Sequence, residues 1–184
     1  VWVDVAVAAA KLLGERDCPP AMRELLRREG PGRATVRQVV AAVEGSVPVP
    51  ELATWPVNGA RLAAPVPDPG SFLDFYAFEE HVRRARARRG LEIVPEWYRY
   101  PVYYRSNQRA MVGPDAEVVF PAGKAKMDFE LELAAVLGSA LESPTADGAE
   151  AAIAGYCLLN DWSARAIQAE VMKVRMLPAA TVFS

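Results

Sequence analysis

The residues best suited to chemistry in this chain stand at every second position of one short stretch. Residues 126–138 read K-M-D-F-E-L-E-L-A-A-V-L-G, and polar and apolar side chains alternate strictly over 128–133. A period of two predicts a half-buried β-strand, because successive side chains point to opposite faces. Asp128, Glu130 and Glu132 therefore share one face, where their negative charges repel one another unless a positive group lies among them.

Two interpretations of this acidic face remain open on the strand alone. Carboxylate oxygens are the ligands that hard divalent cations such as Mg²⁺ and Ca²⁺ prefer, so the spacing suits a metal site. A solvated acidic edge strand is the other interpretation. The choice depends on what the neighbouring elements bring to the same place.

Composition narrows the class of protein. The chain has 184 residues, 52% of them hydrophobic, and a net charge of −2. This length accommodates one domain, or a domain with an arm, around a substantial core. No apolar run approaches the ~20 residues of a membrane helix, and the charge gives no general attraction to nucleic acid. Cys18 and Cys157 lack metal-ligand spacing. We expect a cytoplasmic protein with reduced cysteines and no membrane or nucleic acid partner.

The first third of the chain predicts a helical arm. Helices are expected over residues 4–15 and 21–28, and from Thr35, as N-cap, to Glu44. The proline-rich residues 46–70 follow as extended chain or loop, with a short strand over 60–65. We place a boundary near Pro65, which gives an arm over residues 1–65 and a second domain over residues 66–184.

The segment 71–90 carries further candidate groups. Gly90 is a natural helix stop, and arginines in the last turns complement the helix dipole. If the whole segment is helical, Asp74 and the only histidine, His81, lie two turns and about 10.5 Å apart on one face. The five arginines from Arg83 to Arg89 are typical of a solvated helix face, with phosphate or nucleic acid binding as the alternative.

An aromatic cluster and two further strands follow. Residues 96–104 read E-W-Y-R-Y-P-V-Y-Y, which is either a strand at the core edge or a pocket wall whose tyrosines donate to a polar ligand. Strands are predicted over 117–120 and 155–160, and the second runs into a helical turn from Asp161. The sequence contains no phosphate loop, dinucleotide fingerprint or zinc motif.

Four segments in this order resemble the fumarylacetoacetate hydrolase family. They read D-F-Y-A-F-E-E-H at 74–81, W-Y-R-Y-P-V-Y-Y at 97–104, M-D-F-E-L-E at 127–132 and G-Y-C-L-L-N-D-W-S-A-R-A-I-Q at 155–168. The resemblance implies an α+β, β-rich fold, a mixed β-sandwich roll preceded by a small N-terminal helical segment. The expected partners are a small-molecule dicarbonyl or 2-oxo acid substrate and a second copy of the chain in a homodimer.

The resemblance also implies roles for individual residues. A divalent cation, Mg²⁺ with Ca²⁺ or Mn²⁺ as alternatives, is held by four carboxylates, which fall on Asp74, Glu130, Glu132 and Asp161. His81 falls on the family's general base, and a neutral imidazole near pH 7 can take a proton from water. Asp128 matches no family ligand, so we leave it outside this set. Four residues fall on positions that bind substrate oxygens: Tyr76, Tyr104, Arg165 and Gln168.

The activity implied by the resemblance is hydrolysis of a C–C bond in a 1,3-dicarbonyl acid, such as fumarylacetoacetate or an acylpyruvate. In it the cation polarises a carbonyl, His81 activates water, and Arg165 offers a bidentate fork to a substrate carboxylate. A decarboxylase, hydratase or isomerase acting on a related 2-oxo acid is the alternative among enzymes. A non-catalytic homologue that serves as a binding or assembly subunit is the alternative outside them.

The pattern departs from the family after Gln168. Val171 replaces a family glutamate, and Ala166 stands where an aspartate is common. Val182 falls near the position where the family has a lysine that contributes to the site. Lys173 matches a different position, so it does not take over that role. The family domain is expected to continue for several strands beyond residue 184. We therefore expect either that the sequence is part of a longer chain or that a partner or strand exchange completes it, in preference to a degenerate homologue.

Overall fold

The computed structural model describes residues 2–14, 18–19, 21–27, 29–45, 48, 53–120, 123 and 126–174. The chain groups into two compact units, one of residues 1–68, 112–117 and 131–159, the other of residues 69–111, 118–130 and 160–184. The two longest strands, β5 (Met127–Leu137) and β6 (Ile153–Ala164), contribute residues to both. The division near residue 65 that the sequence suggests stays a prediction.

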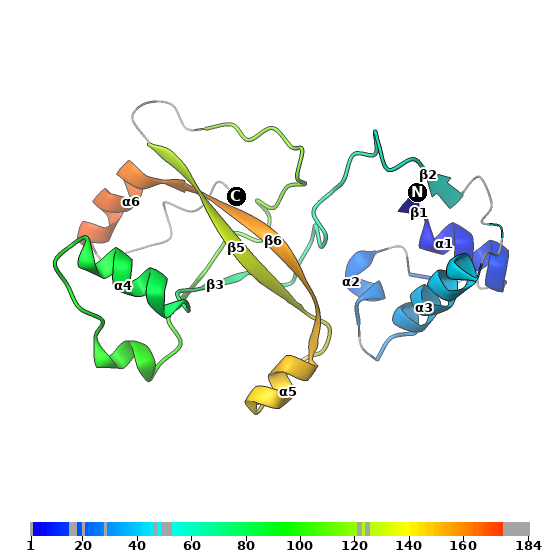
Figure 1. Ribbon diagram of the computed structural model, residues 1–184, viewed down its shortest axis with the longest axis horizontal. Coiled ribbons are helices and arrows are strands. Elements are labelled where there is room, and N and C mark those ends of the chain that lie inside the picture. Colours follow the sequence, from blue (N-terminus) through cyan, green and yellow to red (C-terminus); the bar gives the residue numbers. More distant parts are fainter. Residues whose placement is uncertain are drawn as a thin grey trace. The chain divides into compact units, whose positions relative to one another are not determined.

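The first unit begins with short helices around a small apolar core. They are α1 (Val5–Ala8), the π-helix η1 (Ala9–Leu13), α2 (Met22–Leu25) and α3 (Pro31–Glu44). α3 lies beside α1 (Figure 1). Strands β1 (Trp2–Val3) and β2 (Thr54–Trp55) pair antiparallel. The buried residues of this core are Ala8, Ala9, Val39 and Ala53.

The ends of these helices follow from local chemistry. Asp4 caps α1, because its Oδ1 accepts a hydrogen bond of 2.9 Å from the Val7 N–H. Gly14 ends η1 with φ of 72°, a left-handed conformation that glycine adopts without strain. The predicted N-cap at Thr35 is wrong. α3 begins at Pro31, whose fixed φ suits the first turn, and the Thr35 hydroxyl donates back to the Pro31 carbonyl.

In the second unit, a three-residue strand occupies part of the segment 71–90. β3 (Leu73–Phe75) pairs antiparallel with β4 (Tyr103–Arg105), so the segment 71–90 is not helical throughout and Asp74 does not share a helix face with His81. Helix α4 (Glu79–Ala87) starts only after Phe78, where Glu79 and Glu80 in the first turn favour its N-terminus. The 3₁₀ helix η3 (Pro95–Tyr98) precedes β4.

The long strands β5 and β6 form a two-stranded sheet, visible as the paired ribbons in Figure 1. Helix α5 (Ala146–Ala151) connects them, and Thr145 caps it. β6 runs to Ala164, and α6 (Arg165–Val171) begins directly after it, followed by η4 (Met172–Val174). The predicted helical turn from Asp161 is therefore wrong, and so are the strands predicted over 60–65 and 117–120, which are irregular.

Along β5, the acidic face is the more buried one. Glu130 and Glu132 are half-buried, whereas Phe129, Leu131 and Leu133 are 64%, 74% and 59% exposed. The alternation of the sequence thus appears as expected, with the apolar side chains on the open face. The structure combines helices with small sheets; the closed β-sandwich roll stays a prediction. No helix in the described part of the chain is long and apolar enough to cross a membrane.

Candidate metal centre

The pairing of β3 with β4 brings the first two candidate residues together. Asp74 lies directly opposite Tyr104 in the antiparallel register, and directly opposed residues project from the same face. The pair is fixed on both sides, because the Tyr76 N–H donates to the Val102 carbonyl and the Ser106 N–H to the Phe72 carbonyl. The Tyr104 hydroxyl lies 2.5 Å from Asp74 Oδ2.

β6 brings a second carboxylate to the same hydroxyl. Asp161 is only 3% exposed, and its Oδ2 lies 2.7 Å from the Tyr104 hydroxyl. That hydroxyl has a single proton, so it cannot donate to Asp74 and Asp161 at the same time. One of the two carboxylates therefore needs another partner, and a proton or a cation can serve as one.

The electrostatics of these carboxylates reflect that need. Burial raises the pKa of Asp161 to about 6, and the negative charges of Asp74 and Glu130 act in the same direction against the hydrogen bond from Tyr104. Burial likewise raises the pKa of Asp74, although the Tyr104 hydroxyl lowers it. Both groups thus hold protons more tightly than a solvated aspartate does.

A third carboxylate completes an oxygen-only cluster. Asp74, Glu132 and Asp161 each offer one oxygen, and these oxygens lie within 4.8 Å of one another. Asp161 Oδ1 is buried without a hydrogen-bond partner among the described residues. A buried anionic oxygen without a donor is unfavourable. The donor set and the unpaired oxygen both fit a hard divalent cation.

Glu130, the fourth predicted ligand, has different neighbours. Its Oε1 accepts hydrogen bonds from the Ser163 hydroxyl, at 3.1 Å, and from Arg165 Nη1. Glu130 is not part of the group formed by the other three carboxylates. Both bonds use the same oxygen, and Oε2 accepts none from the described residues, which leaves it available to a cation. The metal roles of all four residues stay predictions.

Arg165 is committed to several partners. Its Nε donates to Asp128 Oδ2 at 2.9 Å, and its Nη1 donates to Glu130 and, at 3.2 Å, to Gln168 Oε1. Gln168 follows three residues later on α6 and thus lies on the same side of the helix. Hydrogen bonds from Arg165 and from the Phe129 N–H lower the pKa of Asp128.

Two residues in this network were not predicted. Asp128 matches no ligand position of the family, and Ser163 lies beyond the end predicted for its strand. Periodicity could have indicated both residues. Asp128 shares a strand face with Glu130, and Ser163 shares one with Asp161 if the strand predicted to end at residue 160 is extended. Which residues would then face one another required the register of β5 against β6.

His81 and Tyr76 lie next to each other beside this cluster. Their rings meet edge to face, with centroids 5.4 Å apart. Trp97 Nε1 donates to the Tyr76 carbonyl at 2.8 Å and fixes the chain at that point. A positive charge on His81 lowers the pKa of Asp74, so the imidazole is within electrostatic reach of the carboxylates.

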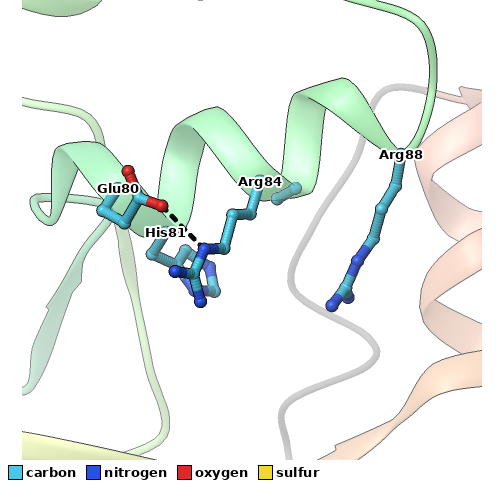
Figure 2. Close-up of a pocket in the computed structure, with 5 residues that line it drawn as sticks. Glu80, His81, Arg84 and Arg88 are labelled. Atoms are coloured by element: carbon cyan, nitrogen blue, oxygen red, sulfur yellow. Dashed lines mark hydrogen bonds and ion pairs between the residues drawn. The ribbon is translucent and has the colours of Figure 1, made fainter.

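His81 also lines a pocket of about 290 Å³ against α4, shown in Figure 2. The other lining residues of the described chain are Glu80, Arg84, Ala85 and Arg88. Arg84 pairs with Glu80, and Arg88 has no ion pair with the described residues. The catalytic and substrate roles of His81, Tyr76, Tyr104 and Gln168 stay predictions, and Val182 lies outside the described residues.

Comparison with known proteins defines the class. The family model for "Fumarylacetoacetate (FAA) hydrolase C-terminal" matches residues 71–182, more than half of the chain. The chain therefore belongs to the fumarylacetoacetate hydrolase family, as its motifs indicated. The matched region contains every candidate site residue named above.

Individual relatives are similar over part of their length. The fumarylacetoacetase of Arabidopsis thaliana is 35% identical over 120 residues, covering 54% of this chain and 28% of that protein. The fumarylacetoacetase of Oryza sativa subsp. japonica is 28% identical over 161 residues, covering 74% and 37%. The chain thus matches about a third of the length of these curated relatives.

A solved structure supports the fold. The crystal structure of a protein assigned as HpcE from Mycobacterium smegmatis superposes with a TM-score of 0.61 at 22% identity, covering 99% of this chain and 54% of that one. This likeness concerns the fold alone. It is consistent with the mixed arrangement of helices and strands described above.

Proposed function

We propose that this chain forms the metal-binding part of a hydrolase that cleaves a C–C bond in a 1,3-dicarbonyl acid. The observation that carries the proposal is the convergence of Asp74, Glu132 and Asp161, with the buried oxygen Asp161 Oδ1 lacking a donor. These three residues, with Glu130 through Oε2, would hold the cation, for which Mg²⁺ is the best candidate. The bound cation supplies Lewis-acid polarisation of a substrate carbonyl.

The protein groups perform the proton transfers and stabilise the charge. His81 accepts a proton from water as the water oxygen adds to the carbonyl carbon. The C–C bond then breaks, and its electron pair remains on the departing fragment as an enolate. Arg165 and Gln168 donate hydrogen bonds to substrate oxygens and so stabilise this anion. The protonated His81 returns its proton to the enolate carbon, which gives a carboxylic acid and a ketone.

The charges around the pocket beside His81 support the proposal that the substrate is an anion. Arg84 and Arg88 project along the same side of α4 as His81 (Figure 2). Glu80 offsets one of the two positive charges, so the pocket keeps a positive excess. The partial negative charge at the C-terminus of the helix, about half a unit, is smaller than that excess. A substrate carboxylate would be attracted there.

The homodimer and the cytoplasmic location expected from the sequence carry over as parts of this proposal. Three neighbouring side chains on the open face of β5 are large, apolar and mostly exposed: Phe129, Leu131 and Leu133. Such a patch favours association with a second surface.

His81→Ala tests the proposed mechanism. We expect the rate of Mg²⁺-dependent turnover of an acylpyruvate to fall about 10²- to 10⁴-fold in the variant, because general base catalysis contributes that much. The measurement is the decrease of the ultraviolet absorbance of the enolised substrate.

A control shows that the variant still folds and binds the cation. Mg²⁺ should raise the melting midpoint of His81→Ala as much as that of the wild type, since binding to the native state alone stabilises it. Equal turnover by the two proteins would refute the role of His81. No turnover by either would refute the proposed hydrolase activity.

A further inference from the structure

The five N–H groups of Arg165 can be accounted for one by one. The single Nε–H donates to Asp128 Oδ2, and the two N–H groups of Nη1 have two acceptors, Glu130 Oε1 and Gln168 Oε1. Nη2, with two N–H groups, makes no hydrogen bond to a described residue. Within the described part of the chain, Nη2 is thus the guanidinium nitrogen that remains free to bind another group.

In this arrangement, the hydrogen bonds to described residues occupy the nitrogens that the bidentate fork expected for Arg165 would use. A guanidinium binds a carboxylate through two neighbouring nitrogens, either Nη1 with Nη2 or Nε with Nη2. The first pair lacks Nη1, which is held by Glu130 and Gln168. The second lacks Nε, which is held by Asp128. As long as Asp128 accepts the hydrogen bond from Nε, the second pair stays occupied as well as the first.

We propose that Asp128 is a positioning residue that orients Arg165, so that Arg165 offers Nη2 alone to a single substrate oxygen. The oxygen that suits one charged donor is the one that becomes negative when the C–C bond breaks. Asp128 thereby makes Arg165 a donor for the developing enolate and removes its affinity for a ground-state carboxylate. The substrate part of this inference rests on the proposed function, whereas the orientation of Arg165 does not.

Asp128 is itself held in place for this purpose. Its Oδ1 accepts a hydrogen bond of 3.0 Å from the Phe129 N–H, which leaves Oδ2 for Arg165. The Arg165 N–H donates to the Lys126 carbonyl at 3.1 Å, so backbone and side chain tie the start of α6 to the start of β5. The side chains of Arg165 and Asp128 are 35% and 48% exposed. A pair this exposed adds little to stability, so its main effect is on orientation.

The orientation is tested without substrate by nuclear magnetic resonance of the arginine Nε–H groups. Arg165→Lys identifies the resonance by its absence. In Asp128→Ala, we expect the exchange of this proton with solvent to accelerate at least about tenfold, because its acceptor is gone. Asp128→Asn, which keeps an oxygen acceptor, should restore part of the protection. The matched control is Asp115→Asn in an exposed turn, which should change nothing.

The link to the reaction is tested by kinetics on an acylpyruvate. A donor to the developing enolate acts in the transition state, so Asp128→Ala should lower kcat about tenfold and change KM less than about twofold. In an Arg165→Ala background, the same substitution should have no further effect, because Asp128 acts through Arg165.

Each other outcome would overturn a stated part of the inference. Unchanged Nε–H exchange in Asp128→Ala would refute the orientation of Arg165. A raised KM with unchanged kcat, no kinetic effect at all, or a full effect that persists without Arg165 would refute the role in the reaction. A wild-type protein that turns over no acylpyruvate would refute the proposed function, while the exchange measurement would still decide whether Asp128 orients Arg165.

Discussion

The two ends of the acidic face of β5 have different partners. At one end, Asp128 and Glu130 share the guanidinium of Arg165. At the other, Glu132 lies with two further carboxylates, Asp74 and Asp161, to which Tyr104 brings a hydroxyl and no charge. Like charges are stable side by side only when opposite charge is supplied. Arg165 cancels one of the two negative charges at the first end, whereas at the second end the buried Asp161 Oδ1 has no hydrogen-bond partner among the described residues.

This difference suggests how one strand face can serve two purposes. The identical spacing of the three acidic residues does not distinguish between them. The distinction comes from β6 and α6, which supply an arginine to one end and another carboxylate to the other. Equivalent substitutions at the two ends should therefore have very different consequences.

Asp161→Asn should have the largest effect on the affinity for Mg²⁺. Removing a charged ligand should weaken Mg²⁺ binding by more than the roughly 10- to 100-fold that is typical of losing an outer partner of a ligand. Asp128→Asn makes the same chemical change at the other end and should weaken binding by about tenfold at most. Isothermal titration calorimetry with Mg²⁺ measures both, and equal losses would contradict the distinction between the two ends.

The pH dependence of stability should differ in sign between the two ends. The pKa of Asp161 is raised to about 6 from 3.8, so its contribution to the stability of the metal-free protein is full below about pH 4 and lost as the pH rises through about 6. The pKa of Asp128 is lowered by its hydrogen bonds from Arg165 and Phe129. Its contribution is therefore present at neutral pH and lost as the pH falls through the lowered value.

Thermal melting from about pH 2 to about pH 8 measures this contrast. Relative to Asp161→Asn, the metal-free wild type should lose stability as the pH rises towards 7, and Mg²⁺ should restore it above about pH 6. Relative to Asp128→Asn, the wild type should gain a small amount of stability as the pH rises through the acidic range. Parallel curves for the wild type and Asp161→Asn would show that Asp161 carries no raised pKa.

The sequence was informative where a local pattern determines the structure. Alternation is enough to place Glu130 and Glu132 on one face, and a glycine at position 14 is enough to end a helix. The alternation could not indicate which face of β5 is exposed, because it shows only that the two faces differ. The exposure of Phe129 and Leu131 could therefore not be predicted from the alternation.

Contacts between distant segments account for what could not be predicted. The pairing of Asp74 with Tyr104 depends on two three-residue strands, which are too short to show a period. The number of acceptors around Arg165 depends on the register of β5 against β6. A bidentate fork is a reasonable expectation for an isolated arginine, and the tertiary structure adds acceptors to Nε and Nη1 of Arg165 that the sequence does not reveal.

The central claim is that the second end of the acidic face binds a divalent cation, and crystals grown with Mn²⁺ would test it most directly. We expect an anomalous scattering peak about 2.1 Å from carboxylate oxygens of Asp74, Glu130, Glu132 and Asp161, and no such peak between Asp128 and Arg165. A cluster without a peak, or Mn²⁺ bound elsewhere while Asp161 Oδ1 pairs with a protein donor, would contradict the claim.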